Sequence, residues 1–70
     1  MTLTPFELNR MEELIYASKS RSLTPLEESE LRNYVLTEQP NAKDAPISQL
    51  ITLGLILVGL YLLAKAFEEK

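Results

Sequence analysis

The sequence predicts an all-α fold, in which a short N-terminal hairpin of two amphipathic helices precedes one C-terminal transmembrane helix. Two nearly identical helix-start motifs stand 20 residues apart, and apolar residues recur at helical spacing behind each motif. A long uncharged run then fills the last third of the 70-residue chain. We expect the hairpin within residues 1–37, a linker at 38–46, the transmembrane helix at 47–67 and a short tail at 68–70.

A repeated L-T-P-x-E motif, at residues 3–7 and 23–27, marks the start of each hairpin helix. Thr suits the N-cap, and Glu at the third helical position closes a capping box. Pro suits the first helical position because its missing N–H would be unpaired there anyway. We expect helices at about 5–18 and 25–37, joined by a short polar connector at 19–22.

Each hairpin helix carries an apolar stripe, and we interpret the two stripes together as an interaction face. The residues of this hairpin face are Leu8, Met11, Leu14, Ile15, Leu31, Tyr34 and Val35. Two short stripes bury too little apolar surface to outweigh the chain entropy that is lost on ordering. We therefore expect a third surface to cover them, supplied by the membrane or by a larger partner protein. A favourable i,i+4 pair between Glu28 and Arg32 is expected on the second helix.

The last third of the chain has the length and composition of a membrane span. No charged residue occurs in the 20 positions 45–64, and eleven of these positions are Leu, Ile or Val. A helix over 46–64 is about 28 Å long at about 1.5 Å per residue, close to the ~30 Å hydrocarbon core of a bilayer. The alternative is a buried core helix of a soluble oligomer, which needs every side of the helix covered. The residues expected to anchor the far end at the membrane interface are Tyr61, Lys65 and Phe67.

Small residues recur at heptad spacing along this run, at Ala45, Thr52, Gly59 and Ala66. A heptad repeat keeps residues on one seam of a left-handed helix pair, and small side chains let helices approach closely in lipid. We interpret these four positions as a helix-packing seam for another membrane helix or a second copy of the chain. The alternative is that small residues, which are common in membrane helices, share this spacing by chance.

Composition excludes several functional classes. The chain has no Cys and no His, which removes disulfides, thiolate or imidazole metal sites and histidine-based catalysis. A net charge of -3 argues against nucleic acid as a partner and against a polybasic lipid tether. The sequence shows no nucleophile paired with a base, no glycine-rich phosphate loop and no spaced set of metal ligands. We therefore expect no enzymatic activity, no cofactor and no metal.

These observations favour a small single-pass, tail-anchored membrane protein that serves as an accessory or assembly subunit of a larger membrane complex, cellular or virion. One alternative is an adaptor whose hairpin recruits a soluble partner, and another is a self-assembling, holin-like membrane-active protein. The expected partners are the bilayer, other membrane helices or further copies of the chain, and a soluble protein at the hairpin. Because no N-terminal export signal is evident, we expect residues 1–44 on the cytoplasmic side.

Overall fold

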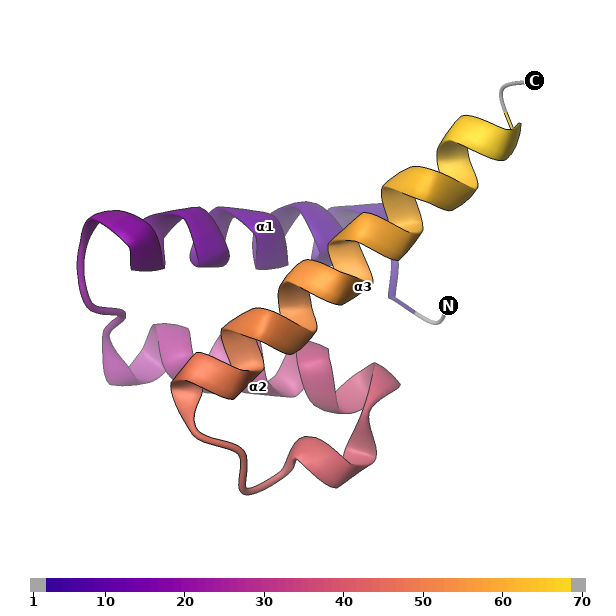
Figure 1. Ribbon diagram of the computed structural model, residues 1–70. Helices are drawn as coiled ribbons and strands as arrows, with labels where there is room; N and C mark the ends of the chain where they lie inside the picture. Colours follow the sequence, from indigo (N-terminus) through magenta and orange to yellow (C-terminus); the bar gives the residue numbers. More distant parts are fainter. Residues whose placement is uncertain (1–2, 69–70) are drawn as a thin grey trace.

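In a computed structural model, which describes residues 3–68, the chain folds into three α-helices (Figure 1). Helix α1 spans Pro5–Ser20, α2 spans Pro25–Glu38 and α3 spans Ile47–Glu68, with one 3-10 turn, η1, at Pro40–Ala42. The all-α fold that ends in a long apolar helix is confirmed. Helix α1 ends two residues later than the sequence predicts and α2 one residue later.

Both hairpin helices begin where the repeated motif predicts. Thr4 Oγ1 accepts a hydrogen bond from the backbone N–H of Glu7 at 3.1 Å, and the Glu7 carboxylate accepts one from the N–H of Thr4 at 2.9 Å. Thr24 and Glu27 make the same pair of bonds at 3.2 and 2.9 Å. Each capping box satisfies two backbone donors that a helix start leaves unpaired, so the two starts are fixed by local sequence.

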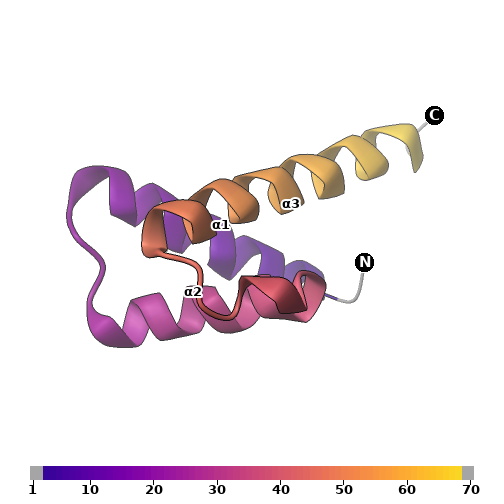
Figure 2. The same ribbon diagram turned by 60° about the horizontal axis from the view of Figure 1, so that its bottom comes forward.

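Helices α1 and α2 form an antiparallel hairpin, and α3 lies diagonally across it (Figures 1 and 2). The chain reverses at η1, which brings the N-terminal part of α3 back over the hairpin. Helix α3 contacts both α1 and α2, and its C-terminal part extends past them. The three helices therefore form one unit with a single projecting helix end.

One hydrophobic core lies where the three helices meet. Its largest fully buried side chains are Met11, Leu14, Ile15, Leu31, Val35 and Leu50. Because Leu50 belongs to α3, the third surface that the hairpin needs is supplied in this structure by the chain's own last helix. The sequence alone had suggested the membrane or a partner protein for this role.

Candidate functional site

Helix α3 is the helix among the described residues that is long and apolar enough to cross a membrane. Its 22 residues extend about 33 Å at about 1.5 Å per residue. The hairpin covers little of this length, since the buried residues of α3 are Leu50, Gly54, Leu57 and Val58. The helix thus divides into a docked half, residues 47–58, and a projecting half, residues 59–68.

The docked half of α3 buries one of its sides on the hairpin. Leu50, Gly54, Leu57 and Val58 recur at the spacing that places them on one side of a helix, and that side is buried on the hairpin. The polar residues of this half, Ser48, Gln49 and Thr52, are all exposed. The outer side of this half is mixed, because Leu55 and Ile56 are exposed as well.

Gly54 is a point of close approach between α3 and α1. A Cβ atom built on Gly54 would lie 2.8 Å from Cδ1 of Ile15 and 3.6 Å from Sδ of Met11. The absence of a side chain at this position therefore lets the two helices come into contact. Gly54 was not among the residues that the sequence singled out, although it lies four residues after Leu50, three before Leu57 and four before Val58, which places it on the same buried side.

The projecting half of α3 is largely uncovered, although Tyr61 packs against the core. None of its residues is buried in the part of the chain that the structure describes, and only Tyr61 is half-buried. The large apolar side chains that α3 leaves exposed, at 47–66 % of their full surface, are Leu55, Ile56, Leu60, Leu62, Leu63 and Phe67. An exposed apolar surface of this kind is typical of a site that contacts a membrane or another protein.

The predicted helix-packing seam does not lie against another helix of this chain. Ala45 is half-buried in the segment before α3, and Thr52, Gly59 and Ala66 are exposed. A Cβ atom built on Gly59 would meet nothing within 4 Å. The seam is therefore open to the surroundings, and its role in helix packing stays a prediction. The three predicted interface anchors, Tyr61, Lys65 and Phe67, all lie on the projecting half. Tyr61 is half-buried and the other two are exposed, and their role at a membrane interface stays a prediction.

The hairpin face predicted from the sequence lies in the core. Six of its seven residues are buried, and Tyr34 is half-buried. The Tyr34 hydroxyl donates a hydrogen bond of 2.9 Å to the carboxylate of Glu30, which also forms an ion pair with Arg10 at 2.7 Å. These three polar groups tie α1 to α2 along one edge of the core. The hydrogen bond from Arg10 lowers the pKa of Glu30, and burial raises the pKa of Tyr34.

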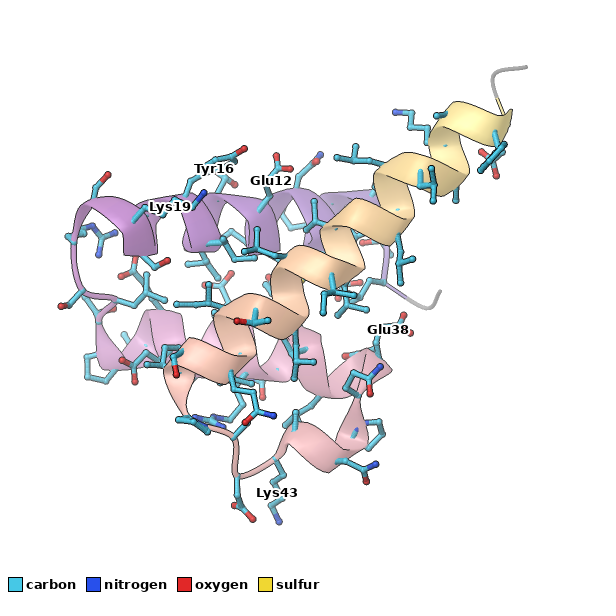
Figure 3. All side chains as sticks on the ribbon, viewed as in Figure 1. Glu12, Tyr16, Lys19, Glu38 and Lys43 are labelled. Atoms are coloured by element: carbon cyan, nitrogen blue, oxygen red, sulfur yellow. The ribbon has the colours of Figure 1, made fainter. Side chains whose placement is uncertain are left out.

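A second ion pair joins the connector to the start of α2. Both terminal nitrogens of Arg21 donate to the carboxylate of Glu27, each at 2.7 Å. These bonds from Arg21, together with the bond from the backbone N–H of Thr24, lower the pKa of Glu27 to about 2. On the outer side of α1, the ammonium group of Lys19 lies 5.1 Å from the centre of the Tyr16 ring (Figure 3).

Arg32 holds the segment that leads into α3. Its Nη1 donates to the backbone carbonyls of Lys43 and Ala45, at 2.9 and 2.8 Å, while the Lys43 side chain points away from the helices (Figure 3). The expected pair between Glu28 and Arg32 does not form within salt-bridge distance among the described residues. The guanidinium group instead donates to two backbone carbonyls that lie outside any helix. Backbone carbonyls that are buried without a hydrogen-bond partner lower the stability of a fold.

The structure offers little for small-molecule chemistry. A shallow cavity of about 210 Å³ lies between the connector and the start of α3. Its lining residues are Ser18, Arg21, Ser22, Leu23, Glu28, Ile47 and Ile51. Within residues 3–68, no group of three or more Asp or Glu side chains could hold a metal ion. The exposed apolar side chains of α3, and those of Phe6 and Leu26 on the hairpin, are the surfaces that remain as functional candidates. No protein-family model, curated protein or solved structure matches this chain.

Proposed function

We propose that this chain is a small single-pass membrane protein without enzymatic activity that serves as an accessory or assembly subunit of a larger membrane complex. The observation that carries the proposal is the projecting half of α3, which leaves large apolar side chains uncovered. In water, such a surface is unfavourable by about 25 cal/mol for each Å² of apolar area. A bilayer or the helices of other membrane proteins remove this cost.

The composition of α3 supports a complete crossing of the membrane. Its charged residues occur only near the C-terminal end, at Lys65 and Glu68. From Ile47 to Ala64 each central Leu, Ile or Val favours insertion by roughly 0.3–0.6 kcal/mol. In the proposed orientation, residues 1–44 face the cytoplasm and the charged end lies beyond the opposite interface.

The open seam supports a role within a complex. Thr52, Gly59 and Ala66 are exposed, and the space beside Gly59 is free to a distance of at least 4 Å within this chain. In lipid, helices associate largely through close packing at small residues. A neighbouring transmembrane helix fits this seam better than it fits the bulky sides of α3.

Membrane integration is the first test of the proposal. The full chain, expressed in its host or in bacteria, is expected to stay with the membrane fraction after alkaline carbonate extraction. A chain that is released by carbonate and runs as a monomer in detergent-free buffer contradicts the proposed function.

Co-purification from mild detergent tests the role as a subunit. We expect the wild-type chain to migrate in a large complex, and Gly59→Leu to release it because the added side chain separates the packed helices. Ala64→Leu is the matched control, since it enlarges another small, exposed residue of α3 that lies off the seam. Equal behaviour of the two variants removes the seam from the proposal.

An adaptor anchored by α3 is a second candidate, favoured by the apolar residues at the variable position of the repeated motif. Phe6 and Leu26 occupy this position, and they are 75 % and 83 % exposed. Replacing α3 by an unrelated apolar helix separates the two functions. An adaptor keeps its soluble partner after the exchange, whereas a subunit that packs through α3 loses its complex.

A further inference from the structure

We infer that the hairpin is a reversible dock for residues 47–58 of α3, and that docking on the hairpin and crossing of the membrane exclude each other. The inference rests on the proposed membrane function. It adds a conformational step, because α3 must leave the hairpin before it can span the bilayer. The apolar side of residues 47–58 contacts the hairpin face in one form and lipid in the other.

Helix length makes the two arrangements incompatible. A span needs about 20 apolar residues to cross the hydrocarbon core, and in α3 these include the whole docked half. With the docked half held on the hairpin, only the ten residues from Gly59 to Glu68 project, a length of about 15 Å. The charged hairpin cannot follow α3 into lipid, where ionised side chains of α1 and α2 are strongly disfavoured.

Partial insertion of the projecting half does not resolve this conflict. The tip of the projecting half carries Lys65 and Glu68. If this half entered one leaflet from its tip, these charges would come to rest near the bilayer centre, where they are most costly. Complete crossing places them in water on the far side, so the membrane-bound form that suits the sequence is the undocked one.

The contacts of the docked half are suited to a reversible association. The docked half contributes three buried large side chains, Leu50, Leu57 and Val58, together with the close contact between Gly54 and Ile15. The polar residues Ser48 and Gln49 face outward in the docked form. In the spanning form they lie at the membrane entrance, where polar groups reach the headgroups. The same sequence is therefore compatible with both positions.

An engineered disulfide across the docking contact provides the test, and the natural chain has no Cys that could interfere. A Cβ atom on Gly54 would lie 3.7 Å from Cγ1 of Ile15, close to where a Cys sulfur would stand. The double variant Ile15→Cys/Gly54→Cys is prepared in full-length form and mixed with phosphatidylcholine vesicles, oxidised or reduced. The fraction resistant to carbonate after flotation is then measured. The control pair is Ile15→Cys/Gly59→Cys, because Gly59 has no neighbour within 4 Å.

We expect the oxidised double variant to integrate at least about fivefold less than the reduced one. The control pair is expected to show no dependence on oxidation. Equal integration of the oxidised and reduced double variant overturns the inference, and so does failure of the cysteines to crosslink in buffer. If the reduced and wild-type chains do not integrate but the crosslink forms, docking is real and the proposed membrane function fails, taking this inference with it.

A pair of glycine variants repeats the test without cysteine. Gly54→Leu fills the space that Ile15 occupies and should weaken docking, so its initial rate of integration should rise by about fivefold. Gly59→Leu adds the same apolar side chain at an open position and should leave the rate close to that of the wild type. Equal acceleration by both variants shows that hydrophobicity alone sets the rate and rejects the dock.

Discussion

At the scale of single residues, the two copies of the L-T-P-x-E motif cap their helices identically but differ in their charged neighbours. Glu7 caps α1 through Thr4, whereas Glu27 caps α2 and also accepts two hydrogen bonds from Arg21. The additional positive charge stabilises the ionised form of Glu27, so its pKa falls from 4.5 to about 2. The Glu27 carboxylate therefore stays ionised to a lower pH than an ordinary Glu side chain.

The depressed pKa of Glu27 predicts how stability depends on pH. A carboxyl group whose folded pKa lies below its unfolded pKa contributes stability that is fully present above about pH 4.5 and is lost as the pH falls towards 2. In an NMR titration, we expect the carboxyl carbon of Glu27 to titrate near pH 2 in the wild type. In Arg21→Gln it should titrate closer to 4.5.

Arg10→Gln is the control for this titration, because Arg10 binds Glu30 and not Glu27. It should raise the pKa of Glu30 and leave that of Glu27 in place. A Glu27 carboxyl that titrates normally in the wild-type protein contradicts the bidentate pair.

At the scale of elements, the three helices share one core to unequal degrees. Leu31 of α2 lies where all three meet and is 0 % exposed, whereas Leu26 of the same helix is 83 % exposed. The hairpin therefore depends on a few side chains that point towards α3.

Leu31→Ala and Leu26→Ala form a matched pair of substitutions in α2. Leu31→Ala should lower the free energy of unfolding by about 2–5 kcal/mol, because it leaves a cavity in the core. Leu26→Ala should change it by no more than about 0.5 kcal/mol. Urea denaturation followed by far-ultraviolet circular dichroism measures both values, and similar losses for the two variants contradict the observed core.

Local sequence predicted the elements well and their packing only in part. Thr4 and Thr24 fix helix starts through bonds to residues three positions away, so a reader of the sequence can locate them. The hairpin face was also predictable, because polar residues separate its members. The docked side of α3 was not, since Leu50, Leu57 and Val58 are surrounded by similar residues and carry no contrast that marks one side. The contact of Gly54 with the hairpin was not predictable for the same reason.

At the scale of the whole molecule, α3 meets two requirements at once. Its docked half covers the apolar face of the hairpin, and its full length is sufficient to cross a bilayer. A residue that is exposed in the docked form and lies near the middle of the proposed span can be substituted without disturbing docking. Such a variant tests membrane integration alone. Ile56 is such a residue, at 53 % exposure and near the middle of α3.

Ile56→Arg should therefore block integration without disturbing the docked fold. A central Arg in place of Ile disfavours insertion by about 3–4 kcal/mol, so the carbonate-resistant fraction should fall sharply. Gln49→Arg is the control, because Gln49 is also exposed but stands near the helix start, where a long side chain reaches the headgroups. If Ile56→Arg integrates as well as Gln49→Arg, the centre of α3 does not lie in lipid.

The charged residues that follow the apolar run affect the rate of membrane crossing as well as the final position of α3. Residues 65–70 hold two Lys and two Glu, and moving each of them through the hydrocarbon interior costs roughly 2.5–3.5 kcal/mol. The same cost applies when the charged end passes back through the bilayer. If α3 crosses the membrane as we propose, a chain that has crossed should return slowly, so the time at which α3 leaves the hairpin should determine how many molecules become integrated.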